Sequence, residues 1–254
     1  MKKTHLIILS LFLTSAIIIT ATVITYKALT VPKSKKYVVE TIEANSKGYI
    51  KVGIISDAQL PQEEKNLYGW DYATVMNGAD HLIKALKYYK SQNVDMIVFN
   101  GDMVNATGDY AAYSAYNKIL DYVYGEDRAE APHIIYPMGN HEFYGGNQEH
   151  NFYKSTGLPL NTRTIVNGYS FISISNSKLE KGDEELAESN DTLADGTYNE
   201  KRIEFLKEQL AAANTEDPNK PIFVFIHMPI SNIVNGGHWA TPQYEEIYSI
   251  LKEY

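Results

Sequence analysis

The chain has 254 residues, of which 44% are hydrophobic and 21% charged, a composition typical of a globular protein with a sizeable core. It contains no cysteine, which excludes a disulfide scaffold, thiolate-bound metals and a cysteine nucleophile, so any metal must be held by His, Asp, Asn, Gln or Glu. The formal net charge is −8, but residues 1–36 contain six lysines and no acidic residue, so residues 37–254 hold 17 basic and 31 acidic side chains. So acidic a domain is not expected to bind a nucleic-acid duplex, and a small anionic substrate needs a local positive centre, which a metal ion supplies.

Residues 6–24 form an apolar segment of 19 residues without a charge, preceded by Lys2 and Lys3. The segment is long enough to span a bilayer, and no clear small-x-small cleavage site follows it. We therefore expect a signal anchor, with a cleaved signal peptide as the alternative and a buried core helix behind both. The lysines up to residue 36 then form a tether, and the acidic domain is expected on the extracytoplasmic side of the cell membrane, or secreted if the signal is cleaved. Lysines on both sides of the segment leave its topology open.

From residue 37 onward, short β-rich runs alternate with helical patterns, which predicts one α/β domain over residues 37–254. In chain order the predicted elements are a strand at 49–56, a helix at 71–91, a strand at 95–100, a helix at 109–124, a strand at 133–138, strands at 162–166 and 169–175, a helix at 199–213, a strand at 221–228 and an amphipathic helix at 242–253. The dipeptide Asn167-Gly168 predicts a two-residue turn that makes an antiparallel hairpin, so the sheets are expected to be mixed. Residues 178–197 are predicted to form a surface loop, and His150 is placed in a polar loop.

Four of the predicted strands end in polar residues that a packed core would not choose. These residues are Asp57 and Gln59, then Gly101-Asp102, then Gly139-Asn140-His141-Glu142, and finally His227. In open α/β sheets, ligands bind outside the carboxyl ends of the strands, so these side chains are expected to converge on one site. Each of them alone has an ordinary explanation as a helix cap, a turn residue or a buried histidine.

The order of these residues resembles the signature of the calcineurin-like metallophosphoesterase family. The resemblance covers residues 49–254 and is carried by Asp57-Ala58-Gln59, Gly101-Asp102-Met103-Val104-Asn105, Gly139-Asn140-His141-Glu142 and His227-Met228-Pro229. It implies an α/β fold in which two mixed β-sheets pack as a sandwich between flanking helices. It also implies two divalent metal ions at one edge of the sandwich, for which carboxylate, amide and imidazole ligands suit Mn²⁺, Fe or Zn²⁺.

The resemblance further implies a role for each ligand. Asp102 would bridge the two metals, Asp57 and Gln59 would hold the first ion, and Asn140 and His227 the second. A metal-bridging hydroxide would attack phosphorus, so that a small phosphorylated substrate, a phosphomonoester or phosphodiester, is hydrolysed.

The resemblance also gives His141 the catalytic role, because it follows a metal ligand and could stabilise the developing charge or protonate the leaving oxygen. The alternative for His141 is an orienting hydrogen bond to a loop carbonyl. Glu142 would begin a helix or support the ligands from behind, and Asn105 and His238 are weaker candidates for contact with the substrate.

Two features depart from the family pattern. Gln59 stands where the family has His, so it predicts a weaker first site, a harder ion, or a side chain that only faces the cleft. The family's last motif, Gly-His-x-His, is not found after the predicted helix at 242–253, so we expect the chain to stop short of it; Gly237-His238 precedes that helix and is assigned to an active-site loop. The alternative function is therefore a catalytically degenerate module that binds metal, phosphate or an envelope partner.

Overall fold

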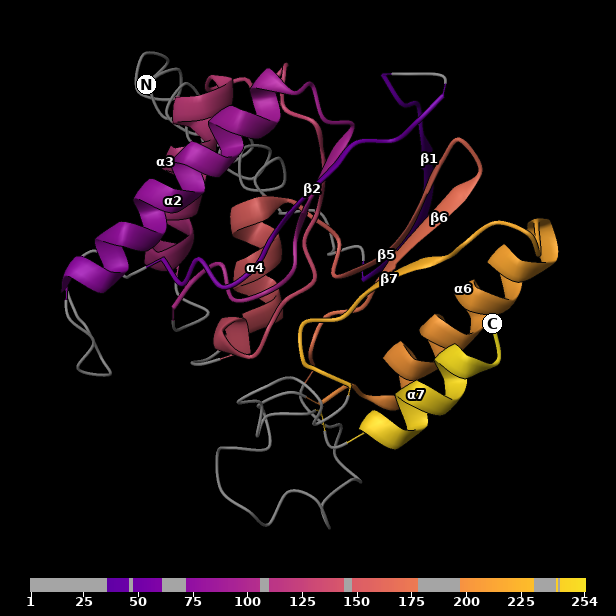
Figure 1. Ribbon diagram of the computed structural model, residues 1–254. Coiled ribbons are helices and arrows are strands. Elements are labelled where there is room, and N and C mark those ends of the chain that lie inside the picture. The colour runs from indigo at the N-terminus through magenta and orange to yellow at the C-terminus, as the bar shows by residue number, and fades with distance from the viewer. Residues whose placement is uncertain are drawn as a thin grey trace, which may run out of the picture. The chain divides into compact units, whose positions relative to one another are not determined.

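The computed structural model describes residues 36–45, 48–60, 72–105, 110–143, 148–177, 197–230, 241 and 243–254, all of which belong to the unit Ser34–Tyr254 (Figure 1). The predicted membrane segment at 6–24, His238 and all but the last residue of the predicted loop at 178–197 lie outside the described residues. Within the described part of the chain, no helix is long and apolar enough to cross a membrane.

Two β-sheets form the centre of the described part of the chain. The first is parallel, with the order β2-β3-β4, and contains β2 (Val52–Ile55), β3 (Met96–Phe99) and β4 (His133–Ile135). The second has the order β1-β5-β6-β7 and contains β1 (Tyr37–Ile42), β5 (Asn161–Val166), β6 (Tyr169–Ser173) and β7 (Phe223–Phe225). This second sheet is mixed, because β5 and β6 are antiparallel while β1 with β5 and β6 with β7 are parallel.

The hairpin predicted at Asn167-Gly168 is present between β5 and β6. Val166 pairs with Tyr169 across a two-residue loop, and Asn167 and Gly168 have φ values of 50° and 78°. Positive φ at both central positions is the condition for the type I′ turn, whose twist matches that of the flanking strands. The local sequence therefore sets the register of this hairpin.

The two faces of β3 join two separate cores. Met96 and Val98 pack into a cluster with residues of the second sheet, including Phe171, whereas Ile97 and Phe99 pack into a cluster with the helices. All four β3 side chains have 0% exposure. A strand buried on both faces reads as an uninterrupted apolar run, which is why 95–100 lacks the alternation of a surface strand.

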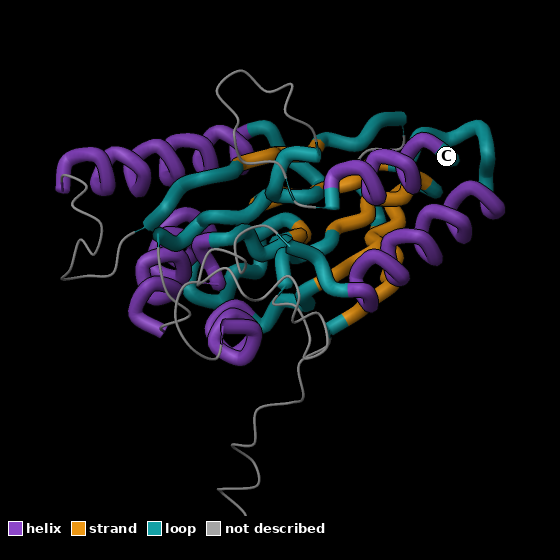
Figure 2. The backbone as a smooth tube through the Cα atoms, turned by 90° about the horizontal axis from the view of Figure 1, so that it is seen from below, coloured by secondary structure: helices purple, strands orange, loops and turns teal. Residues whose placement is uncertain are grey.

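Helices cover the outer faces of both sheets, and their apolar residues complete the cores. α2 (Tyr72–Ser91), α3 (Tyr110–Tyr124) and α4 (Gln148–Thr156) lie beside the parallel sheet, while α6 (Glu200–Glu216) and α7 (Tyr244–Lys252) lie beside the mixed sheet (Figure 1). Leu86 and Tyr116 belong to the core of the first group, and Leu206 and Ile247 to that of the second. Figure 2 shows the strands between these helices from a second direction. The predicted α/β fold with two packed sheets is confirmed, although both sheets were predicted to be mixed and, among the described residues, the sheet β2-β3-β4 is parallel.

Two elements differ from the sequence prediction. Strand β1 was not predicted; it pairs in parallel with β5, about 120 residues away along the chain, with Tyr37 opposite Asn161. The region of His150 was predicted to be a loop and is instead helix α4, whose Phe152 is buried against α3. In both cases tertiary contacts stabilise a segment whose own pattern is weak.

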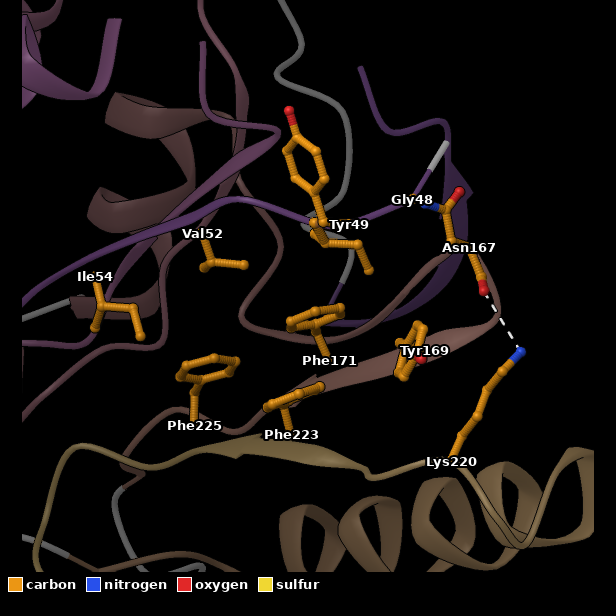
Figure 3. A pocket seen from close by; sticks show the side chains of 11 residues that line it. Gly48, Tyr49, Val52, Ile54, Asn167, Tyr169, Phe171, Lys220, Phe223 and Phe225 are labelled. Atoms are coloured by element: carbon orange, nitrogen blue, oxygen red, sulfur yellow. Dashed lines mark hydrogen bonds between the residues drawn. The ribbon is translucent and has the colours of Figure 1, made fainter. Parts of the chain in front are cut away.

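An apolar groove of about 660 Å³ lies between β2 and the strands β6 and β7 (Figure 3). Val52 and Ile54 face it from one side, and Phe171, Phe223 and Phe225 from the other. The ring of Phe171 stacks on that of Phe223, with the centroids 4.8 Å apart. None of the predicted metal ligands lines this groove, so the candidate site lies elsewhere.

Candidate metal centre

Five of the predicted site residues, Asp57, Asp102, Asn140, His141 and His227, meet at one edge of the sandwich. Asp57 follows β2, Asp102 follows β3, and Asn140 and His141 follow β4; these three strands are parallel neighbours, so their carboxyl ends share an edge. His227 reaches the same place from the end of β7 in the other sheet. One ligand atom from each of Asp57, Asp102 and His227 lies within 4.8 Å of the other two. This is a set of atoms that could hold a metal ion.

The loops after β2 and β3 are joined by backbone hydrogen bonds. The amide of Asp57 donates to the carbonyl of Gly101 at 3.2 Å, and the amide of Gln59 donates to the carbonyl of Asp102 at 2.9 Å. Asp57, Gln59 and Asp102 have φ values of 58°, 44° and 53°. Left-handed conformations of such residues cost on the order of 1–3 kcal/mol each and persist only where surrounding contacts hold them. The backbone is thus strained at the predicted ligands.

Two glycines allow the ligands to approach one another. A Cβ atom at Gly139 would lie 2.2 Å from Asp102 Oδ1, and a Cβ atom at Gly101 would lie 2.5 Å from the ring of His227. Any side chain at these positions would displace a predicted ligand. Gly101 also has a φ of 84°, which favours glycine.

Both ring nitrogens of His227 lie close to oxygen atoms. Its Nδ1 lies 2.8 Å from the carbonyl oxygen of Asn100, which can only accept, so Nδ1 carries the proton. Its Nε2 then lies 3.1 Å from Asn140 Oδ1 and 3.2 Å from Asp102 Oδ2. Three atoms with lone pairs face one another here, and either a second proton on His227 or a cation resolves the repulsion between them.

The electrostatics of His227 follow from this arrangement. Burial lowers the pKa of His227, but the hydrogen bond and the negative charge of Asp102 raise it more, to about 9. Without a metal, His227 is therefore protonated at neutral pH. A divalent cation bound between Asp102 and His227 would replace that proton.

His141 is oriented by its own backbone and by the loop after β3. Its amide donates to Asp102 Oδ1 at 2.9 Å, and its Nδ1 lies 2.6 Å from the carbonyl oxygen of Asn105. The Nε2 atom lies 3.8 Å from Asp102 Oδ2. The orienting hydrogen bond that the sequence offered as an alternative is present, and it directs Nε2 towards the predicted ligands.

The remaining predicted site residues lie in different surroundings. Gln59 is half-buried, and its backbone amide donates a hydrogen bond to the carbonyl of Asp102. The role of its side chain as a metal ligand stays a prediction. Asn105 is buried, and among the described residues its Oδ1 has no hydrogen-bond partner. Contact of Asn105 with substrate also stays a prediction, and His238 lies outside the described residues.

For Glu142 the sequence left two roles open, the start of a helix or support of the metal ligands. Glu142 lies in a 3-10 turn, η1 (His141–Phe143), and has 0% exposure. The pKa of Glu142 is raised above its usual range, because burial and the charge of Asp102 outweigh the hydrogen bonds from Tyr136 and from the amide of Asp102. In the sequence, only its place at the end of Gly-Asn-His-Glu pointed to Glu142.

Residues 50–253 match the family model described as calcineurin-like phosphoesterase, and the chain belongs to this family. This confirms the resemblance that the four motifs carried. No curated protein matches the chain. Among solved structures, the chain is similar to the crystal structure of a dimetal phosphatase from Danio rerio, with a TM-score of 0.60 and 18% identity over 81% of this chain and 78% of that chain. At 18% identity, this likeness shows that the two chains share a fold and nothing further.

Proposed function

We propose that the protein hydrolyses phosphate monoesters or diesters with the help of two divalent metal ions. Membership of the calcineurin-like phosphoesterase family supports metal-dependent phosphoesterase chemistry in general. The observation that carries the proposal for this chain is the meeting of Asp57, Asp102 and His227 at the ends of three different strands. Two carboxylates and an imidazole whose ligand atoms meet in this way form a donor set that a divalent cation can share, in place of the proton that His227 otherwise carries.

The donor atoms fit the proposed ions. Asp57, Gln59 and Asp102 would hold one metal, and Asp102, Asn140 and His227 the other. Carboxylate, amide and imidazole donors suit Mn²⁺, Fe and Zn²⁺. The carbonyl of Asn100 binds Nδ1 of His227, which orients the ring and leaves Nε2 as the donor to the metal, the usual support for a histidine ligand. When bound, the ions would polarise the phosphate oxygens and make water more acidic.

In this proposal His141 acts on the leaving group. The Asn105 carbonyl holds Nδ1 of His141, so Nε2 is the ring atom that faces the substrate side of Asp102. There it would stabilise developing charge or hand a proton to the leaving oxygen, which contributes about 10²- to 10⁴-fold to a rate.

The test is an assay on the full 254-residue chain, freed of metal by a chelator and supplied with Mn²⁺, Zn²⁺ or Fe²⁺. Hydrolysis of p-nitrophenyl phosphate or its bis ester that returns with metal, and that Asp102→Ala removes, is the expected result. Activity that persists in chelator or in Asp102→Ala would contradict the proposal.

A metal-binding module without turnover is the second candidate, and Gln59 favours it because an amide is a weaker ligand than the imidazole of the family pattern. Mn²⁺ binding by the same purified protein without hydrolysis of either ester would support this candidate. Absence of Mn²⁺ binding would overturn both.

We also propose that residues 6–24 anchor the protein in the cell membrane with the acidic domain outside the cytoplasm. The length and apolar character of that segment support this. Fractionation of the full chain into membranes, followed by protease treatment of intact cells, tests it. Recovery from the soluble cytoplasmic fraction would contradict it.

A further inference from the structure

The carboxylate of Glu142 is the acceptor for donors from two motif loops. Its Oε2 accepts from the amides of Asp102 at 2.9 Å and Gly139 at 2.7 Å. Its Oε1 accepts from the amides of Met103 at 2.8 Å and Val104 at 3.3 Å and from the hydroxyl of Tyr136 at 2.7 Å. Three consecutive amides of the loop after β3 therefore point at one side chain that belongs to the loop after β4.

This arrangement determines where Asp102 lies. Asp102 has a φ of 53°, a conformation that its own side chain disfavours, and its amide is tied to Glu142. With its amide directed back to Glu142, its carboxylate faces His227 and the amide of His141. Five donors converge on the two oxygens of this one side chain, and a buried donor that loses its acceptor costs about 1–3 kcal/mol, so these hydrogen bonds can hold a strained loop.

Glu142 is not placed to touch a metal or a substrate. Both of its oxygens are occupied by donors and the residue has 0% exposure. It also lies outside the group of acidic and imidazole side chains whose ligand atoms converge.

We propose that Glu142 is a positioning residue, which holds the loop of residues 102–104 in the shape that lets Asp102 bind metal. The inference deepens the proposed function, because it names a residue on which the metal site depends although it binds no metal itself. Residues that orient metal ligands typically contribute about 10- to 100-fold to metal affinity.

The experiment is calorimetric titration of the metal-free full chain with Mn²⁺ alone. In Glu142→Gln, the side-chain amide group replaces one acceptor by a donor that faces two backbone N–H groups in either orientation, and the Tyr136 hydroxyl as well if it takes the place of Oε1. We expect the dissociation constant for Mn²⁺ to rise about 10- to 100-fold. Glu142→Asp keeps the carboxylate and is expected to lose less Mn²⁺ affinity than Glu142→Gln. If the wild type is active, kcat at limiting Mn²⁺ falls in Glu142→Gln and recovers at high Mn²⁺, while KM for p-nitrophenyl phosphate at saturating Mn²⁺ stays constant.

Tyr136→Phe provides a milder variant if Glu142→Gln does not fold, because it removes one of the five donors and keeps the ring. Tyr113→Phe is its matched control: Tyr113 is buried nearby, and among the described residues its hydroxyl has no hydrogen-bond partner. We expect weaker Mn²⁺ binding in Tyr136→Phe and unchanged binding in Tyr113→Phe.

The results separate this inference from the proposed function. Weaker Mn²⁺ binding in the Glu142 and Tyr136 variants supports it even if the wild type hydrolyses no ester. Wild-type affinity in a folded Glu142→Gln, or equal effects of Tyr136→Phe and Tyr113→Phe, would overturn it even if the wild type is an active phosphoesterase. A wild type that does not bind Mn²⁺ would overturn it as well.

Discussion

Nε2 of His227 lies 3.2 Å from Oδ2 of Asp102, although the two residues follow strands of different sheets. Asp102 extends from β3 in the parallel sheet, and His227 extends from β7 at the edge of the mixed sheet. The contact therefore depends on how the two sheets pack, through the shared core of Met96, Val98 and Phe171. A metal ion between Asp102 and His227 would bind to both sheets at once.

Metal binding is expected to stabilise the fold through this contact. A ligand that binds only the folded state at about 100 times its dissociation constant adds about 2.7 kcal/mol to the free energy of unfolding. We expect this gain with Mn²⁺ in the wild type and its loss in His227→Ala, measured by thermal or urea unfolding with and without chelator. His81→Ala, on the exposed side of α2, is the control and should keep the full gain. An equal gain in His227→Ala would exclude His227 as a ligand.

Gly139→Ala is expected to weaken the metal site without removing any ligand. The new Cβ would lie 2.2 Å from Asp102 Oδ1 and 2.7 Å from the amide nitrogen of Asp102. Overpacking of this kind costs about 1–3 kcal/mol of stability, and here it also moves a ligand. Gly48→Ala is the matched control, because nothing lies within 4 Å of its Cβ position. Urea unfolding and Mn²⁺ titration of both variants check this, and equal behaviour of the two would refute the steric argument.

His141→Ala is expected to separate catalysis from metal binding. The variant keeps the backbone amide that donates to Asp102, so Mn²⁺ affinity should stay at the wild-type value. The loss of the imidazole should lower kcat by about 10²- to 10⁴-fold. Steady-state kinetics at saturating Mn²⁺ measure the effect, with His150→Ala in α4 as the control. A kcat loss explained wholly by weaker Mn²⁺ binding would instead make His141 a structural residue.

Stability is expected to depend on pH through His133, which lies away from the metal ligands. Burial lowers the pKa of His133 and the charge of Glu40 raises it, and the net shift is downward from 6.5. The unfolded chain then binds a proton more readily than the folded one, so the stability associated with neutral His133 is complete above about pH 6.5 and falls as the pH drops below it.

Urea unfolding in chelator between about pH 7.5 and 5 tests this, by comparing the wild type with His133→Gln. The wild type should lose stability relative to the variant as the pH falls. His81→Gln, at an exposed position, should follow the wild type throughout. A wild type that gains stability at low pH would mean that the ion pair between His133 and Glu40 at 3.3 Å outweighs burial.

Local patterns in the sequence were sufficient for most of the fold, and they named three side chains that the structure brings together, Asp57, Asp102 and His227. The hairpin at Asn167-Gly168 was predictable because positive φ at two successive residues depends on the residues themselves. The helix at 71–91 was predictable because apolar residues recur at its period. Asp57, Asp102, Asn140 and His227 were recognised because polar groups directly after apolar strands are unusual, and their order matches a family signature. The proposed substrate class and the predicted membrane segment also come from the sequence.

Only the tertiary structure decided which of these residues meet. The pairing of β1 with β5 and the burial of Phe152 on α4 depend on segments far apart in the chain, which leave little trace in either segment alone. The function of Glu142 depends on three amides of another loop pointing at it, and backbone amides carry no sequence signal. The amino-acid sequence determined which chemical groups are present and on which strand ends they lie. Their distances were set by the packing of two sheets, because burial of the apolar faces between them fixes where those strand ends come together.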